Sequence, residues 1–385
     1  MRAFIISDEQ IAAIAASLVV DELSAHFGRH VDTLTASNWS SETPLGEAGA
    51  ALNDEEALAC LRRLYAFFGR LDCAPDVAAG RSFGDWGKYI RAAIEERMHE
   101  FSFSAAGDEG HPFRHAADAI FGDAASFANL IYGRRRVLSL VAPHSLIGFV
   151  LSVLAPNLLQ APSIDARRMT PDELKKNLAF GDALIATPSL WRYVLAQGVF
   201  APDNAMAISF GEALTPELAA DIRKAGFGAQ REVYGSTEHG LIAWRDSPSD
   251  PFALFDQWTR RGEDLQRVTP SGDSVDVNPM DVLSWIGDRR FRLGGRRDGA
   301  VQIGAVNVFP ARISQRIAEH PDVSACEVAV THHANSGERI VATITLRSGA
   351  APSESTARSI DLWCRSKLRP YERPRIYNFA GGSAK

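Results

Sequence analysis

The sequence has few cysteines and no block of like charge. Its four cysteines, Cys60, Cys73, Cys326 and Cys364, have neither the paired spacing of a metal site nor the density of a disulfide framework. We expect them to be reduced thiols, which is typical of a cytoplasmic protein. The 47 acidic residues outnumber the 41 basic ones, and no Lys/Arg tract marks a nucleic-acid surface. Nucleic acid is therefore not expected as a partner.

Long uninterrupted apolar runs are also missing. The stretch IAAIAASLVV at residues 11–20 follows two acidic residues rather than a basic region, so it predicts a helix and not a signal peptide. Residues 137–159 are apolar over a length that could span a membrane, but Pro143, His144 and Pro156 interrupt them. We predict a buried strand, a turn and a buried helix there, and no membrane span.

Three segments of the chain differ in their pattern. Residues 1–100 are mostly helical in pattern, with Asn53 as a candidate N-cap and no visible catalytic motif. Residues 101–295 alternate short β-rich runs with helical ones, as in a sheet covered by helices. Residues 296–385, which begin within the Gly and Arg cluster at 294–299, follow the order strand, helix, strand, strand, helix. The predicted fold is α/β, with a large N-terminal domain of helix-covered sheets and a small C-terminal α+β domain.

One short stretch combines many chemical groups. VYGSTEHG, residues 233–240, contains an aromatic ring, glycines, hydroxyls, a carboxylate and an imidazole. Alone, it could be a strand that ends in a turn. It occurs, however, in order with ISFGEALTPEL (208–218), NPMDVLSW (278–285) and FRLGGRRDGAVQIGAVNVFPARI (291–313). Together these stretches resemble the AMP-forming adenylation superfamily, which includes acyl-CoA and aryl-CoA synthetases, nonribosomal-peptide adenylation domains and luciferases.

The resemblance implies that these stretches bind a nucleotide. Tyr234 would lie against the adenine, Thr237 would hydrogen-bond the α-phosphate, and Glu238 would help to hold Mg²⁺. Asp281 would hold the ribose hydroxyls, and Asp298 stands at the family's hinge position between the two domains. The implied nucleotide-binding residues are Gly211, Glu212, Ala213, Tyr234, Gly235, Ser236, Asp281 and Arg296.

Two further stretches resemble the acyl-pocket region of the same family. LVAPHSLIGFVLSVLAP surrounds His144, and GDALIATPSLWRYVL includes Trp191. The resemblance implies that both residues line the acyl pocket. A histidine in a turn can equally be structural, and Trp191 can equally belong to the core. The PHSLIGF segment is most similar to that of synthetases of biosynthetic clusters that act on aromatic acids.

The phosphate loop departs from the family's pattern. The family uses T-S-G-T-T-G-x-P-K to hold the β- and γ-phosphates, whereas residues 105–113 read AAGDEGHPF. Carboxylates beside a triphosphate are unfavourable, since a like-charge pair about 4 Å apart costs about 1 kcal/mol in bulk water and about 4 at an effective dielectric of about 20. The altered positions are Ala106, Asp108, Glu109 and Phe113, and the basic residues nearby are Arg114, His111 and His115.

The C-terminal end is also irregular. The family's small domain closes with P-R-T-x-x-G-K, whereas this chain ends RIYNFAGGSAK. Lys385 could therefore be the catalytic lysine or a frayed terminus. Ala305 stands where the family has a glycine in the loop used for thioester formation.

Two classes of function remain open. In the first, the chain is an AMP-forming ligase that activates an aromatic carboxylic acid with ATP and Mg²⁺. It then passes the acyl group to coenzyme A or to an acyl carrier protein. Its catalytic residues would be Thr237, Glu238 and Lys385. In the second, the chain is a degenerate member that binds a nucleotide or acyl group as a partner subunit, or an acyltransferase. The altered phosphate loop favours the second class, and the YGSTE and GRRDG stretches favour the first.

Overall fold

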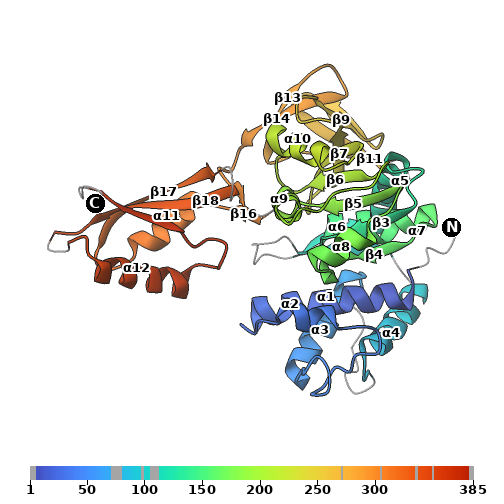
Figure 1. Ribbon diagram of the computed structural model, residues 1–385, viewed down its shortest axis with the longest axis horizontal. Coiled ribbons are helices and arrows are strands. Elements are labelled where there is room, and N and C mark those ends of the chain that lie inside the picture. Colours follow the sequence, from blue (N-terminus) through green and yellow to red (C-terminus); the bar gives the residue numbers. More distant parts are fainter. Residues whose placement is uncertain are drawn as a thin grey trace. The chain divides into compact units, whose positions relative to one another are not determined.

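The computed structural model describes residues 6–70, 80–96, 99–104, 112–269, 272–303, 306–333, 337–348 and 351–380. The chain divides into two compact units (Figure 1). The first consists of Met1–Asn278 and Trp285–Arg292, and the second of Pro279–Ser284 and Leu293–Lys385. The boundary predicted between residues 295 and 296 falls at the end of strand β14 (Arg290–Arg296).

The N-terminal part of the first unit is helical. Its helices are α1 (Asp8–His26), α2 (Thr33–Ser37), α3 (Asp54–Phe67) and α4 (Phe83–Glu96). Asn53 caps α3, as the sequence predicts: its side chain accepts from the Glu56 N–H, and the Glu56 side chain accepts from the Asn53 N–H. Helix α1 packs against both α3 and α4.

The largest sheet of the described residues has the strand order β13-β14-β9-β8-β7-β6-β5-β3-β4. The strands are β3 (Arg136–Ser139), β4 (Ser163–Asp165), β5 (Asp182–Ala186), β6 (Met206–Phe210), β7 (Ala229–Ser236), β8 (Gly240–Arg245), β9 (Phe252–Leu254), β13 (Asp281–Trp285) and β14. Strands β4, β3, β5, β6 and β7 run parallel, and β7, β8 and β9 run antiparallel. Every residue of β5 and β6 is buried, as expected for parallel strands with both faces covered. The carboxyl ends of the parallel strands meet at one edge, where open α/β sheets bind ligands.

Helices from the connections cover this sheet. They are α5 (Ala117–Leu130), α6 (Leu146–Phe149), the π-helical turn η2 (Val150–Leu154), α7 (Ala155–Leu159), the 3₁₀ turn η3 (Ala166–Arg168), α8 (Pro171–Asn177), α9 (Pro188–Ala196) and α10 (Pro216–Lys224). Buried side chains of α8, α9 and α10 form one cluster with alternate residues of the parallel strands, including Leu138, Leu184 and Ala207. Helices α5 and α6 contact β8.

The strand, turn and helix predicted for residues 137–159 are confirmed. Strand β3 ends at Ser139, and α6, η2 and α7 then follow one another from Leu146 to Leu159. Pro156 lies at the start of α7, which continues directly from η2. A proline has no N–H to donate to the preceding turn, and the Ser152 carbonyl oxygen of that turn accepts from Ser163 Oγ instead. Among the helices of the described residues, none combines the length and the apolar character needed to cross a membrane.

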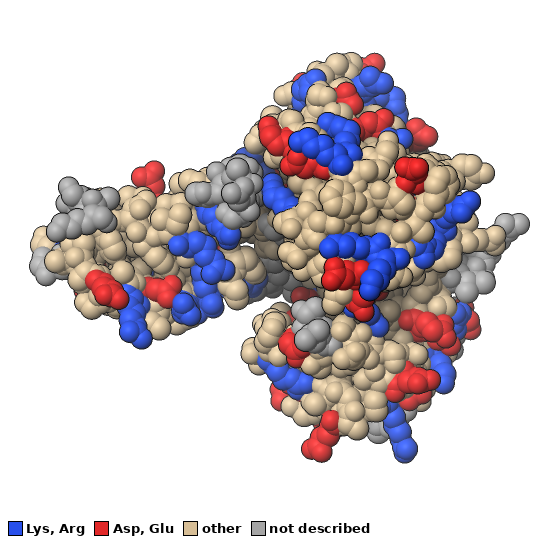
Figure 2. All heavy atoms as spheres, in the orientation of Figure 1, with Lys and Arg blue, Asp and Glu red and all other residues tan. Residues whose placement is uncertain are grey.

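Two smaller sheets complete the first unit. Strands β1 (Glu100–Phe103) and β2 (Phe113–Ala116) form an antiparallel pair, and β10 (Trp258–Arg261), β11 (Asp264–Val268) and β12 (Ser274–Val277) form an antiparallel sheet. On the face shown in Figure 2, acidic and basic side chains of the first unit are interspersed. This mixture agrees with the near balance of acidic and basic residues in the sequence.

The second unit contains a small α+β fold, as the sequence predicts. Its elements after β14 are β15 (Val301–Ile303), β16 (Val306–Val308), α11 (Pro310–Ala318), β17 (Val323–His333), β18 (Gly337–Leu346), α12 (Glu354–Lys367) and β19 (Ile376–Phe379). Strand β19, which the sequence pattern did not predict, pairs in parallel with β18. The core between sheet and helices includes Ile313, Ile344 and Ile360.

Trp191 provides a test of the core of the first unit. Its side chain on α9 is fully buried, its Nε1–H donates to the Ile208 carbonyl oxygen at 3.2 Å, and its ring meets that of Phe227 edge-on at 4.9 Å. We expect Trp191→Ala to reduce the free energy of unfolding by about 3–5 kcal/mol, because the cavity left behind cannot collapse. Denaturant titration measures this. A small loss together with an altered acid preference would instead support the acyl-pocket role.

Candidate active site

Strands β6 and β7 end side by side and carry most of the residues predicted to bind a nucleotide. Phe210 of β6 pairs with Val233 of β7 in parallel register, so the segments that follow both residues lie at the same edge of the sheet. Thr237 and Glu238 form the turn between β7 and β8 and are partly exposed. The structure therefore brings together Gly211, Glu212, Ala213, Tyr234, Gly235, Ser236, Thr237 and Glu238.

Two glycines shape this edge. Gly211, directly after β6, has φ of 86°, and Gly240, at the start of β8, has φ of 82°. Both values lie in the left-handed region that favours glycine. A Cβ on Gly240 would also lie 2.2 Å from Oδ2 of Asp123. Gly240, the last residue of VYGSTEHG, is therefore constrained both by its backbone conformation and by the adjacent buried carboxylate of Asp123.

That carboxylate belongs to a buried ion pair that supports the turn. Asp123 of α5 is fully buried and accepts from the Leu241 N–H at 2.9 Å, from Arg267 Nη2 at 2.6 Å and from Gln257 Nε2 at 2.9 Å. Arg267 Nη1 donates to the His239 carbonyl oxygen at 2.8 Å. Burial raises the pKa of Asp123 to about 6, so it is charged at neutral pH and pairs with the guanidinium. The turn between β7 and β8 is thus held in place by hydrogen bonds from this buried pair.

His115 connects the turn to the strand that follows the phosphate loop. Its Nε2 lies 2.8 Å from the Thr237 carbonyl oxygen. Since a carbonyl only accepts, Nε2 carries the proton and donates. Desolvation lowers the pKa of His115, which keeps the ring neutral at neutral pH. Strand β2 therefore positions the backbone of Thr237.

The altered phosphate loop falls largely outside the described residues, and this applies to Ala106, Asp108, Glu109 and His111. Phe113 begins β2 and pairs with Phe103 of β1. Arg114 Nε donates to the Glu100 carboxylate at 2.9 Å. The charge of Arg114 is therefore already paired within the hairpin.

Tyr234 and Glu212 have defined surroundings. The Tyr234 ring is half-buried and lies 5.7 Å from the ring of Phe252 and 5.8 Å from that of Phe291, centroid to centroid. Glu212 is buried, and Ser189 Oγ donates to its Oε2 at 2.9 Å. The ring of Tyr234, which the resemblance places against the adenine, is thus packed against two other rings, which limits its movement.

The remaining predicted nucleotide and hinge residues belong to the second unit. Asp281 begins β13, and Arg296 ends the neighbouring strand β14. Arg296 donates from Nε to Asp298 Oδ1 at 2.9 Å and from Nη2 to Oδ2 at 2.6 Å. These hydrogen bonds hold the pKa of Asp298 below its usual range. Ala305 and Lys385 lie outside the described residues.

His144 lines a cavity of about 390 Å³ in the first unit. Ser17 Oγ of α1 lies 2.8 Å from His144 Nδ1, and Arg167 Nη1 donates to the same Oγ at 3.0 Å. The other ring nitrogen, Nε2, lies 3.9 Å from Asp21 Oδ2. Trp191 is not among the described residues that line this cavity.

Charged side chains around the cavity are paired with one another. Arg167 donates to both oxygens of Asp165, at 2.9 and 2.7 Å. Arg63 bridges Asp21 and Glu22. Burial alone would raise the pKa of Asp21, but the neighbouring His144 and Arg63 hold it below its usual range. Desolvation lowers the pKa of His144 to about 4, so the cavity holds a neutral imidazole and a carboxylate at neutral pH.

The sequence did not identify Asp123, Arg267, Ser17, Asp21 or Arg167. Asp123 and Arg267 are 144 positions apart, and Ser17 and His144 are 127 apart. No local motif contains such pairs. In the part of the chain that the structure describes, no group of three or more His, Cys, Asp and Glu side chains is arranged to hold a metal.

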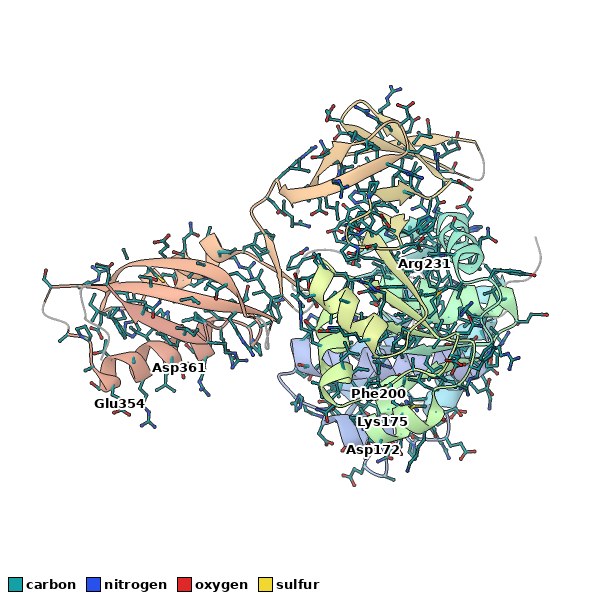
Figure 3. The ribbon with its side chains drawn as sticks, turned by 45° about the horizontal axis from the view of Figure 1, so that its top comes forward. Asp172, Lys175, Phe200, Arg231, Glu354 and Asp361 are labelled. Carbon is teal, nitrogen blue, oxygen red and sulfur yellow. The ribbon has the colours of Figure 1, made fainter. Side chains whose placement is uncertain are left out.

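Asp123→Ala tests the support of the turn. It leaves the buried Arg267 charge unpaired, so we expect a loss of about 3–5 kcal/mol in the free energy of unfolding. Asp172→Ala is the matched control, because Asp172 is exposed on α8 and forms a surface ion pair with Lys175 at 3.0 Å (Figure 3). Denaturant titration of both variants measures the difference. Equal stabilities of the two variants would contradict the role of Asp123.

His144 predicts a pH dependence of stability. Its pKa of about 4 in the folded protein lies below the usual value of about 6.5. Between these values the unfolded chain binds a proton that the folded protein does not, so stability is lost as the pH falls from about 6.5 to about 4, by roughly 3 kcal/mol in total. His144→Gln should flatten this part of the profile in thermal unfolding. An unchanged slope in the variant would show that the imidazole is not the group responsible.

Comparisons with known proteins cover most of the chain. Residues 313–383 match the family described as AMP-binding enzyme C-terminal domain. A 4-coumarate–CoA ligase of Halorhodospira halophila is 29% identical over 95% of this chain and 94% of its own length. A 4-coumarate–CoA ligase of Rhodobacter capsulatus is 30% identical over 61% of each chain.

Two solved structures have a similar fold. The amide bond synthetase McbA from Marinactinospora thermotolerans superposes with a TM-score of 0.58 at 15% identity, over 97% of this chain and 91% of its own. An o-succinylbenzoate CoA synthetase, MenE, from Bacillus subtilis gives a TM-score of 0.57 at 15% identity, over 74% and 66%. These similarities confirm the predicted fold class of a large helix-covered α/β domain with a small α+β domain.

Proposed function

Because the chain belongs to the AMP-forming adenylation superfamily, we propose that it activates a carboxylic acid with ATP and transfers the acyl group to a thiol. The observation that carries this proposal is the shared edge of β6 and β7. There, the Gly211–Ala213 and Tyr234–Glu238 segments directly follow Phe210 and Val233, which pair in parallel register. A partly exposed turn held by a buried ion pair is suited to a reaction that depends on positioning.

The residues of this edge support distinct roles. The half-buried Tyr234 ring offers a flat surface for the adenine, and the Thr237 hydroxyl can donate to an α-phosphate oxygen. Glu238 is partly exposed in the turn between β7 and β8. Mg²⁺ in nucleotide sites is commonly held by one or two carboxylates together with the phosphates. Glu238 fits that requirement, and Mg²⁺ bound there would offset phosphate charge.

The reaction needs no covalent attachment to the protein. The acid's carboxylate oxygen attacks the α-phosphorus, and pyrophosphate leaves with the electrons of the broken P–O bond. A thiolate then attacks the carbonyl carbon of the acyl adenylate, and AMP leaves. We propose an aromatic acid and coenzyme A as substrates, since two relatives are named as 4-coumarate–CoA ligases. An acyl carrier protein is the alternative thiol.

The roles of the second unit are also proposals. Asp281 would hold the ribose hydroxyls, Arg296 would bind the nucleotide, and Asp298 would act as the hinge. Lys385 would approach the reacting carboxylate. The close Arg296–Asp298 pair supports a defined backbone at the hinge. We also propose a cytoplasmic location, which is supported by the free thiols of Cys60, Cys326 and Cys364.

One observation favours a second function. Arg114 is already paired with Glu100, so it does not offset the carboxylates that the sequence has in its phosphate loop. A chain that has lost its triphosphate site would act as a nucleotide- or acyl-binding partner subunit, or as an acyltransferase. Such a protein would still bind AMP at the β6–β7 edge.

Pyrophosphate release distinguishes the two functions. We expect purified protein with MgATP to release pyrophosphate in the presence of aromatic acids and not of medium-chain acids. Glu238→Ala should reduce this release at least a hundredfold, because Mg²⁺ and the phosphates lose their carboxylate partner. Glu217→Ala, an exposed position on α10, is the matched control and should be fully active.

Two results would contradict the proposed reaction. Release that persists in a folded Glu238→Ala variant would refute the assignment of this residue. Failure of the wild-type protein to release pyrophosphate with any acid, while AMP still binds, would establish the second function. Lys385→Ala in parallel tests whether the terminal lysine takes part in the adenylation step.

A further inference from the structure

Large apolar side chains are exposed where the chain enters four neighbouring strands of the largest sheet. These strands, in the order β6-β5-β3-β4, run parallel, so their amino ends meet at one edge, the amino edge. The segment before each strand carries an exposed side chain. In the same order these are Phe200 (68% exposed; labelled in Figure 3), Phe180 (50%), Tyr132 (80%) and Leu158 (45%). We refer to these four side chains as the apolar row.

Hydrogen bonds and strand pairing join the segments that carry the apolar row. The Arg135 N–H donates to the Gly181 carbonyl oxygen at 2.9 Å, which joins the segments before β3 and β5. Arg134 Nη1 donates to the Asn204 carbonyl oxygen at 2.6 Å, which joins the segments before β3 and β6. Strand β4 pairs directly with β3. Since neighbouring strands are about 4.8 Å apart, the row is roughly 14 Å long. Contiguous exposed apolar surface of this kind marks an interaction site.

Two arginines within the row carry charge that no carboxylate balances. The Arg134 guanidinium donates to the backbone and side-chain oxygens of Asn204, at 2.6 and 3.2 Å. The Arg135 guanidinium lies over the ring of Phe180, 5.3 Å from its centroid. In the part of the chain that the structure describes, neither guanidinium has a carboxylate partner. Both positive charges are therefore available to an anionic ligand.

The other charged groups at the amino edge are also mostly basic. Helices α8 and α10 end at this edge, and their last turns contain Lys175, Lys176, Arg223 and Lys224. The carboxylates there are largely paired or exposed to water: Asp182 with Arg136, Asp172 with Lys175, Asp221 with Lys224, and Asp203, which is exposed. The chain as a whole has a net charge of −6, so the amino edge differs from it in sign.

These properties favour the surface of an anionic membrane as the partner. A two-fold dimer through the amino edge would bring the row against itself and place arginines beside arginines, which is unfavourable. Anchor side chains of protein interfaces fill well-packed pockets, whereas the row stands out from the ends of separate segments. Aromatic rings beside arginines suit the boundary between lipid headgroups and acyl chains. The cytoplasmic leaflet, moreover, carries negative charge.

We propose that the amino edge binds the surface of a membrane that contains anionic lipids. The apolar row enters the headgroup region, and Arg134 and Arg135 bind lipid phosphates. This surface is separate from the site of the proposed function. Strands β5 and β6 have five residues each, so their two ends are roughly 17 Å apart. The candidate nucleotide-binding edge lies at the opposite ends of the strands, and this contact leaves it free.

Vesicle flotation of the full-length protein tests the membrane contact. One set of vesicles contains phosphatidylcholine alone, and the other contains phosphatidylcholine and phosphatidylglycerol in equal parts. We expect about tenfold tighter binding to the anionic vesicles, and weaker binding as the salt concentration rises. Replacing both rings, Phe180→Ser with Phe200→Ser, should weaken this binding about tenfold because apolar surface is lost. Arg135→Glu should weaken it by a similar factor through its charge.

Matched controls come from helix α12 of the second unit. Leu362 is 59% exposed and Arg358 is exposed there, so Leu362→Ser and Arg358→Glu change the same properties away from the row. Both control variants should bind anionic vesicles as the wild-type protein does. Thermal unfolding checks that the variants fold. Tyr132→Ser, at the most exposed position of the row, replaces the double variant if that variant does not fold.

Several results would overturn the proposed membrane contact. These are failure of the wild-type protein to bind anionic vesicles, equal binding to both kinds of vesicle, and equal losses in the row variants and the α12 controls. A wild-type dimer that Phe180→Ser with Phe200→Ser abolishes, without vesicle binding, would assign the row to a second copy of the chain. Pyrophosphate release should be the same in the row variants and the wild-type protein, so its presence or absence bears on the proposed function alone.

Discussion

The buried ion pair of Asp123 and Arg267 joins the parts of the first unit that form its candidate nucleotide-binding edge. Asp123 lies on α5, Arg267 lies on β11, and together they bind the backbone on both sides of Gly240. Isolated buried charges are costly, and each of these depends on the other. The pair therefore fixes the sheet of β10, β11 and β12 relative to the largest sheet. It also holds the turn between β7 and β8. Replacing either partner affects the fold and the site together.

Much of the fold and part of the site could be read from the sequence because the relevant signals are local. Asn53 and Glu56 form a capping box within four residues, and Pro143 marks the turn between β3 and α6 directly. The nucleotide motifs end adjacent parallel strands, so their proximity follows from the α/β order. The predicted roles of Glu238 and Tyr234 rest on this order. The short strand β19 was missed because it carries a weak alternating pattern.

The side chains that surround His144 could not be predicted from sequence, because they lie far from it along the chain. Ser17, Asp21 and Arg167 meet His144 only after α1 has packed beside the sheet. Residues 1–100 showed no catalytic motif, yet α1 supplies a hydroxyl and a carboxylate to a cavity at the edge of the sheet. A helix with buried alanines and one serine has the pattern of ordinary packing, and only its tertiary contacts give those polar side chains a chemical setting.

Arg267 lies C-terminal to the VYGSTEHG motif, so the motif is synthesised before the arginine that holds its backbone. A growing chain that has just completed VYGSTEHG contains every residue of the motif, but Arg267 follows His239 by 28 positions. Until β11 has been synthesised and docked, Asp123 lacks its cation and the backbone after the motif lacks its anchor. The turn after β7 is therefore fixed in place late, and a ribosome-bound chain that ends shortly after Gly240 contains the VYGSTEHG motif but lacks the ion pair that holds its backbone.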